Sequence, residues 1–85
     1  MSVIPKPRGI VTNAYSGSSD ETYNNSSNYP WIGLNISNDG GSDLTFQVNC
    51  LTLTVKSGET FDDDFSDFNS IIINSTVAYR LVLRS

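Results

Sequence analysis

The sequence predicts an all-β fold: a small antiparallel β-sandwich, jelly-roll-like or immunoglobulin-like, with an extended N-terminal arm. From residue 44 to residue 84, apolar and polar side chains alternate with the period of two that a half-buried strand requires. Short segments rich in Asn, Gly and Ser separate these runs, as is typical of turns between strands. The 85 residues include one Cys and no His, which excludes an internal disulfide and a Cys/His zinc site. We therefore expect oligomerisation or docking to add to the burial of so small a core.

The first part of the chain, residues 1–29, is predicted to be the arm, and residues 30–85 are predicted to form the sandwich. Ile4-Pro5-Lys6-Pro7 favours extended polyproline geometry, and Ser16–Asn28 is a polar tract with too little apolar content to form a core. Between them, residues 10–15 offer one short strand or an anchor. The apolar side chains of the arm are the expected partner-binding residues, namely Val3, Ile4, Ile10 and Tyr15.

The sandwich is predicted to begin with a strand over Trp31–Ser37. Within it, Gly33 indicates either a bulge or a close approach of another part of the chain. Asn38-Asp39-Gly40-Gly41 contains residues that accept positive φ, so we expect it to close a hairpin into a second strand over Leu44–Asn49.

A third strand is predicted over Leu51–Val55, after a turn at Asn49-Cys50 where a two-residue loop favours Asn-Gly. Cys50 is poorly suited to positive φ, so the turn is either of another type or strained. Lys56–Glu59 is the next predicted turn, and the chain is expected to be extended again at Thr60 and Phe61.

The last two strands are predicted over Ser70–Ser75 and Val77–Arg84, with hairpin connections throughout. The pattern does not decide which isoleucine of residues 71–73 faces inward. The residues expected to supply most of the buried area are Leu44, Phe46, Val48, Leu53, Val55, Phe61, Phe65, Ile72, Val77, Tyr79 and Leu81.

The segment Phe61–Phe68 combines three rings with four aspartates. The rings are four and three residues apart, which predicts a helical turn or compact loop with the rings on one side and the aspartates facing water. The alternative is a calcium site in which Asp62, Asp64 and Asp67 converge. Since the segment lacks the central Gly and the distal Glu of an EF-hand loop, we expect a solvated acidic cap, with no metal and no other cofactor.

Composition excludes several classes of function. Nine acids and five bases give a net charge of −4, and without a basic stripe the body is not expected to bind nucleic acid. The chain has no apolar run long enough to span a bilayer and no signal-peptide pattern, so no membrane association is expected. The absence of His removes the commonest general base, and a carboxylate pair needs a cleft that a small sandwich does not offer. We therefore expect no catalytic residues and no enzymatic activity.

Three aromatic residues form a candidate saccharide platform, namely Tyr23, Tyr29 and Trp31. Flat aromatic faces beside Asn side chains suit the recognition of sugar rings. The other interpretation makes Trp31 an anchor in the core or at an interface, because it stands at the start of a strand. Exposure of the three rings distinguishes the two interpretations.

Several segments together resemble a group of short proteins encoded among the virion genes of tailed phages and prophages of Gram-positive bacteria. They are Asn38-Asp39-Gly40, Ser42–Phe46, Val55–Asp63 and Ala78-Tyr79-Arg80. The resemblance covers roughly residues 34–84 and departs from the pattern at Cys50, where such a hairpin would carry Gly.

The resemblance implies a small β-sandwich module on a phage particle, made in the cytoplasm of the bacterial host and located in the virion. Its expected role is that of a structural protein, a capsid-decoration subunit or a head or tail accessory subunit. Its expected partners are other copies of itself, as a homo-oligomer, and phage capsid or tail proteins. The alternatives are a carbohydrate-binding adhesion module and a small prophage protein that acts at the host envelope during lysis.

Overall fold

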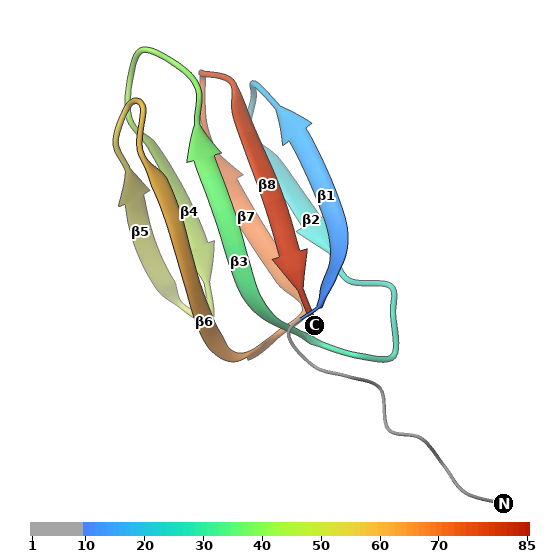
Figure 1. Ribbon diagram of the computed structural model, residues 1–85. Helices are drawn as coiled ribbons and strands as arrows, with labels where there is room; N and C mark the ends of the chain where they lie inside the picture. Colours follow the sequence, from blue (N-terminus) through green and yellow to red (C-terminus); the bar gives the residue numbers. More distant parts are fainter. Residues whose placement is uncertain (1–9) are drawn as a thin grey trace, which may run out of the picture.

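The computed structural model describes residues 10–85, which form two antiparallel four-stranded β-sheets packed face to face (Figure 1). Sheet A has the strand order β1-β8-β3-β6, and sheet B has the order β2-β7-β4-β5. The strands are β1 (Val11–Gly17), β2 (Glu21–Asn24), β3 (Trp31–Asn38), β4 (Leu44–Val48), β5 (Leu51–Val55), β6 (Thr60–Phe68), β7 (Ser70–Asn74) and β8 (Tyr79–Arg84). The predicted all-β sandwich is confirmed.

The topology is that of a jelly roll. The chain pairs like one long hairpin, β1 with β8, β2 with β7, β3 with β6 and β4 with β5. This hairpin is rolled up so that β8 also pairs with β3 and β7 also pairs with β4. Two interlocked four-stranded sheets result, which is the jelly-roll solution to closing a small all-β fold.

The predicted boundary between arm and sandwich at Pro30 is wrong. β1 pairs with β8 along sheet A, and β2 pairs with β7 along sheet B, so residues 11–24 supply one edge strand to each sheet. These strands are polar because an edge strand buries little of its surface. Their backbone hydrogen bonds and two half-buried rings, Tyr15 and Tyr23, hold them to the body.

The predicted hairpin connections are confirmed at one place and wrong elsewhere in the described chain. β4 and β5 form a hairpin, but the connections on either side of it cross between the sheets. At the crossing from β3 to β4, the side-chain amide of the buried Asn38 makes three hydrogen bonds to the backbone. Its Nδ2 donates to the carbonyl oxygens of Ser42 at 2.8 Å and Val55 at 2.9 Å, and its Oδ1 accepts from the N–H of Gly40 at 2.9 Å. Val55 belongs to sheet B, so Asn38 ties the two sheets together.

The turn between β4 and β5 contains two residues with positive φ, Asn49 at 50° and Cys50 at 68°. Both angles lie in the left-handed region, which is the conformation of a tight hairpin loop that matches the strand twist. Of the two possibilities left by the sequence, the chain therefore accepts strain at Cys50. The exposed thiol does not contribute to the core.

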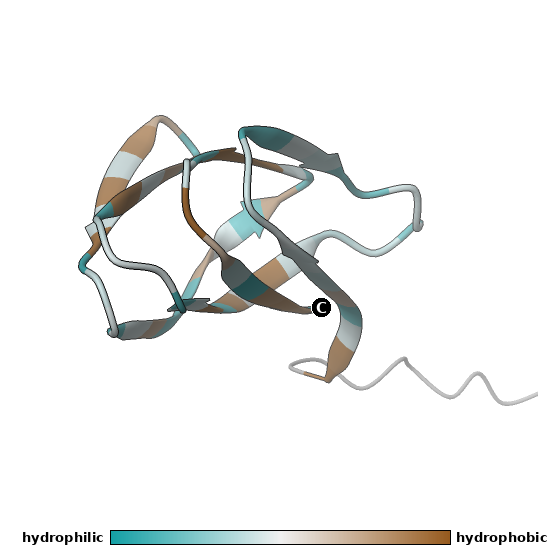
Figure 2. Cartoon of the chain, turned by 90° about the horizontal axis from the view of Figure 1, so that it is seen from above, coloured by the Kyte–Doolittle hydropathy of each residue, from teal (hydrophilic) through white to brown (hydrophobic). Residues whose placement is uncertain are grey.

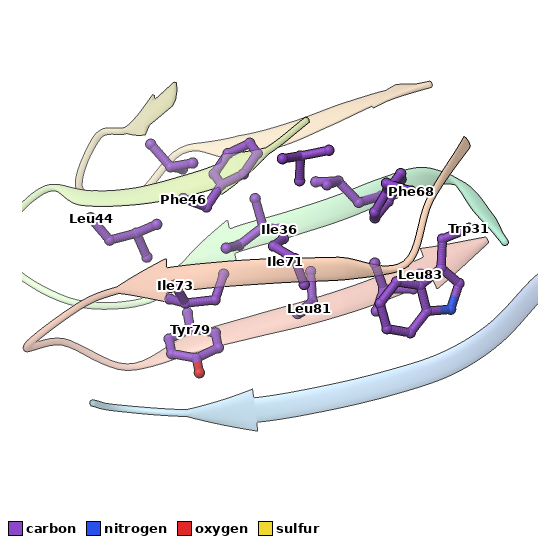
Figure 3. Packing of buried hydrophobic residues seen from close by; sticks show 13 residues of the cluster. Trp31, Ile36, Leu44, Phe46, Phe68, Ile71, Ile73, Tyr79, Leu81 and Leu83 are labelled. Atoms are coloured by element: carbon purple, nitrogen blue, oxygen red, sulfur yellow. The ribbon is translucent and has the colours of Figure 1, made fainter. Parts of the chain in front are cut away.

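The core lies between the two sheets, where apolar side chains from both inner faces pack together (Figure 3). Hydrophobic residues alternate with more polar ones along the strands that enclose it (Figure 2). Phe68 lies near Trp31 at one end of this layer, and Tyr79 lies near Ile73 at the other (Figure 3). The buried apolar residues among those described are Trp31, Leu34, Ile36, Leu44, Phe46, Val48, Val55, Phe68, Ile71, Ile73, Tyr79, Leu81 and Leu83.

The core prediction is confirmed for the β4 and β8 positions and for Val55, and it needs correction elsewhere. Ile72 is 38% exposed, while Ile71 and Ile73 are buried, because successive side chains of a strand point to opposite faces and the odd-numbered residues of β7 face the core. Leu53, Phe61, Phe65 and Val77 are half-buried. The prediction omitted Trp31, Leu34, Ile36, Phe68 and Leu83.

The acidic segment forms strand β6, so the predicted helical turn or loop is wrong. The pairing of β6 with β3 shifts in register between Trp31 and Gly33, so Phe68 faces the core together with Phe61 and Phe65. The ring centroids of Phe61 and Phe65 lie 6.1 Å apart, and those of Phe65 and Phe68 lie 6.0 Å apart. The prediction that the rings share one side and that the aspartates face water is confirmed.

Adjacent isoleucines on β7 provide a test of the inward and outward assignment. Ile73→Ala is expected to lower the free energy of unfolding by about 2–5 kcal/mol, because it leaves a cavity in a packed core. Ile72→Ala is the matched control on the outer face and is expected to cost less than about 1 kcal/mol. Urea unfolding of both variants measures the difference, and equal losses would contradict the assignment.

Removal of residues 1–28 is expected to prevent folding, because it deletes an edge strand from each sheet together with Tyr15 and Tyr23. Removal of residues 1–9 is the control, since it retains all the strands of the described chain. Far-ultraviolet circular dichroism and thermal unfolding distinguish the outcomes. A cooperative transition in the protein without residues 1–28 would show that β1 and β2 are dispensable.

Candidate functional site

The outer face of sheet B is a candidate site for binding a partner. We define the sheet B face by its outward side chains, which are Thr22, Asn24, Thr45, Gln47, Thr52, Thr54, Ser70, Ile72 and Asn74. The register places Thr22, Ile72, Gln47 and Thr52 in one row across the four strands. None of these side chains is charged, although the described chain carries nine acids.

The polar groups of the sheet B face are unpaired within the described chain. Between residues 10 and 85, no side-chain hydrogen bond involves its hydroxyl or amide groups. Ile72 lies in the middle row and is more than one-third exposed. The face therefore presents a small apolar centre surrounded by donors and acceptors that are free to bond to a partner.

The outer face of sheet A is different, because its polar side chains bind one another. The hydroxyls of Ser37 and Thr60 share a hydrogen bond of 2.9 Å, and Asn35 Nδ2 donates to Asp62 Oδ2 at 3.2 Å. Arg80 forms two hydrogen bonds with the carboxylate of Asp39, at 2.7 Å and 3.0 Å. These groups are already satisfied, so this face offers less to a partner.

Arg84 links strands β8 and β6 across β3. Its Nη2 lies 2.8 Å from Asp62 Oδ1 and 3.0 Å from Asp64 Oδ1, and its side chain is 18% exposed. Gly33 stands between them on β3, where a Cβ atom would overlap the carboxylate of Asp64 and the guanidinium of Arg84. Gly33 therefore lies at both a register shift and a close approach, the two possibilities predicted from the sequence.

The polar contacts on sheet A lower the pKa of two carboxyl groups. Hydrogen bonds from Asn35 and then from Arg84 lower the pKa of Asp62. The hydrogen bond from Arg80 lowers the pKa of Asp39. Both groups are open to solvent, so these pairs are screened by salt and add little to stability.

A shallow depression of about 360 Å³ lies on sheet A over β1, β8 and β3. Its lining includes the small side chains of Ala14, Ser16 and Ser37 together with Arg80. It is wide open to solvent and holds no pair of groups placed for acid–base chemistry. We therefore assign it no reaction.

The three aromatics of the predicted saccharide platform do not form one exposed surface. Trp31 is 1% exposed and its Nε1 donates to Asn13 Oδ1 at 3.0 Å, so it belongs to the core. Tyr23 is half-buried, stacks on Tyr15 with ring centroids 4.3 Å apart, and shares a hydrogen bond of 2.8 Å with Tyr79. Tyr29 is 44% exposed.

The predicted partner-binding residues of the arm are dispersed. Val3 and Ile4 lie outside the described residues. Ile10 is 51% exposed and exchanges backbone hydrogen bonds with Ser85. Tyr15 packs against the core, so it is an internal contact of the sandwich and not a free anchor.

Residues 10–85 bring no three His, Cys, Asp or Glu side chains together in a geometry that could hold a metal ion. The acidic side chains of β6 spread along a strand, and Arg84 contacts two of them. The described chain also contains no helix with the length and hydrophobicity needed to cross a membrane.

Comparisons with protein-family models, curated proteins and solved structures give no significant match to this chain. The assignment of function therefore depends on the surfaces of the molecule.

Sequence analysis did not single out the sheet B face. The alternation of Thr45 with Phe46 and of Thr52 with Leu53 predicted outward positions, but no role was assigned to them. The available signal was the composition of those positions, which hold Ser, Thr, Asn, Gln and one Ile, while the charged residues on strands are Glu21, the aspartates of β6 and the arginines of β8.

The Tyr23–Tyr79 contact predicts a loss of stability at high pH. Burial, and next the hydrogen bond with Tyr23, raise the pKa of Tyr79 far above its ordinary value of 10.0. The folded chain thus keeps the phenol neutral while the unfolded chain releases the proton, so this stability is complete below about pH 10 and is lost as the pH rises further.

Urea unfolding from about pH 8 to about pH 11 measures this loss. Tyr79→Phe cannot ionise at this position, and its free energy of unfolding is expected to fall less steeply with pH than that of the unmodified protein. All other titrating groups are common to both proteins. Equal slopes would show that Tyr79 titrates alike in the folded and unfolded chains.

Proposed function

We propose that this chain is a non-enzymatic structural protein of a phage virion, a capsid-decoration subunit or a head or tail accessory subunit. It docks on a symmetric assembly of capsid or tail proteins through the sheet B face. The observation that carries the proposal is that this face is uncharged and leaves its polar side chains unpaired by residues 10–85, on a chain with a net charge of −4.

The composition of the sheet B face suits a protein interface. Charged residues are depleted at the centres of interfaces, because burying a charge without a partner is costly. Hydroxyl and amide groups can exchange their bonds with water for bonds with a partner at little net cost. Ile72 provides an apolar contact in the middle row, where desolvation is most complete.

The size of the face favours a repeated assembly over a single strong contact. Four strands of about five residues cover a plane about 20 Å wide and about 17 Å long. A standard interface buries about 800 Å² on each partner, which is more than this plane can supply. A subunit on a symmetric shell or ring gains further contacts with its neighbours, and the weak contacts act together.

The jelly-roll fold occurs in both viral capsid and lectin domains, so the fold does not choose between a virion subunit and a carbohydrate-binding module. The side chains favour the former. Trp31 contributes to the core, and Tyr23 is half-buried between the sheets, so Tyr29 is the one member of the predicted trio that is open to solvent. The resemblance of residues 34–84 to small virion proteins supports the same choice.

The proposal is tested in particles released by the bacterium that encodes this chain, with each variant replacing the original gene. Quantitative mass spectrometry of purified particles measures the copy number of the chain relative to the major shell protein. Gln47→Lys places a charge in the middle row of the sheet B face and is expected to reduce incorporation at least tenfold. Equal expression is checked in the cell lysate.

Thr60→Lys is the matched control, because it adds the same charge on the outer face of sheet A. It is expected to be incorporated like the unmodified chain. Absence of the unmodified chain from purified particles would refute the virion assignment. Incorporation of the Gln47→Lys variant at the normal copy number would refute the role of the sheet B face.

A further inference from the structure

The two edges of sheet A differ in how they are protected against pairing. β6, at one edge, carries four aspartates and a register shift. Asp63 lies opposite Leu34 in register, on the same side of β6 as Phe61 and Phe65, and remains exposed to water at the edge. Charges, irregular pairing and inward-facing acids are the devices by which β-proteins prevent an edge from binding another strand.

β1, at the other edge, has none of the charges found on β6. Its sequence is VTNAYSG, and within the described chain its single strand neighbour is β8. It has one register shift, between Val11 and Asn13, and regular pairing follows as far as Gly17. Ile10 and Val11 are 51% and 55% exposed, so apolar side chains accompany the open edge at its start.

The pairing of β1 with β8 shows which backbone N–H and C=O groups of β1 point toward the open edge of the sheet. The backbone N–H of Ile10 donates to Ser85 at 3.3 Å, and that of Ser85 donates to Ile10 at 3.1 Å. Since consecutive residues of a strand point these groups to alternate sides, the odd-numbered residues of β8 face β1. The residues of β1 paired with them therefore point their backbone N–H and C=O groups toward β8, and these residues are Asn13, Tyr15 and Gly17. The N–H and C=O groups of Ala14 and Ser16 therefore point outward along the open edge.

We propose that the open edge of β1 pairs antiparallel with β1 of a second copy of this chain, joining two copies of sheet A into one continuous sheet across a two-fold axis. Ala14 and Ser16 of each copy exchange backbone hydrogen bonds with the other. The contact is isologous, so it closes after two copies. This pairing concerns the free protein and does not depend on the virion assignment.

Charge selects a second copy as the occupant of this edge. No charged side chain lies on β1, and its outward-pointing backbone groups belong to the small residues Ala14 and Ser16. In an antiparallel pair about a two-fold axis, Ala14 of each copy lies opposite Ser16 of the other, so two copies meet without like-charge repulsion and without bulky side chains between them. The opposite side of the sandwich, where β6 lies, would bring two sets of aspartates together.

Sedimentation equilibrium over a concentration series of the purified chain tests the proposal. The unmodified protein is expected to dimerise. Ala14→Pro removes an outward N–H while keeping the ladder to β8, since proline is tolerated at an edge where its nitrogen faces solvent. It is expected to weaken dimerisation at least tenfold. Circular dichroism verifies that the variant is folded.

Thr54→Pro is the matched control on β5, the open edge of sheet B. Val48 and Leu51 flank a two-residue turn and exchange hydrogen bonds, so the N–H of Thr54 points outward from its own edge. This variant is expected to dimerise like the unmodified protein. A monomer at all concentrations of the unmodified protein would overturn the proposal, and so would equal dimerisation of the Ala14→Pro and unmodified proteins.

Hydrogen exchange of the unmodified chain gives a second measurement that needs no variant. The amides of Ala14 and Ser16 are expected to be protected in concentrated samples and to exchange rapidly after dilution. The amides of Asn13 and Tyr15 face β8 and are expected to stay protected in both. Rapid exchange of Ala14 and Ser16 at every concentration would also overturn the proposal.

Discussion

The packing of the two sheets against each other is the constraint on which the rest of the molecule depends. Both sheets contribute to one apolar layer, from Trp31 and Leu81 on one side to Phe46 and Ile73 on the other. With a single exposed cysteine the described chain has no disulfide to support this layer. The inner faces are therefore committed to stability, and binding is left to the outer faces and the edges. Asn38 adds a polar link between the sheets that is fully bonded, so it secures the crossing without a buried unsatisfied group.

Periodicity predicted the central strands well and the edge strands poorly. β3 and β4 begin where the alternation predicted, because each buries one face against the other sheet. Among the edge strands β5 is the exception, since its apolar residues also alternate and a two-residue turn joins it to β4, although Leu51 is exposed. β1 and β2 were assigned to an arm, since edge strands have little apolar content and are held by backbone pairing that leaves no mark in the sequence. β6 was misinterpreted because a register shift within a strand and a helical turn can both bring Phe61, Phe65 and Phe68 to one side.

For a related reason, the sequence did not predict which sheet each strand joins or where the candidate site lies. The residues of Asn38–Gly41 suit a hairpin turn and a crossing between sheets equally well, so turn composition could not separate the two. The sheet B face is assembled from β2, β7, β4 and β5, segments that are distant in sequence and become neighbours when the chain rolls up. Its lack of charge is visible in each strand, but its continuity depends on the strand order.

The pairing of β1 with β8 has a consequence for how this protein is made. The first described strand of sheet A must wait for the last, since β8 is its neighbour within residues 10–85 and also fills the space between β1 and β3 (Figure 1). During synthesis, the ribosome tunnel conceals the newest residues, so sheet A can close only after Tyr79–Arg84 has emerged. Until then Leu34 and Ile36 on β3 lack a strand partner on one side. Folding of such nonlocal sheets is slow, so the nascent chain passes through a period in which its strands are open to wrong pairing.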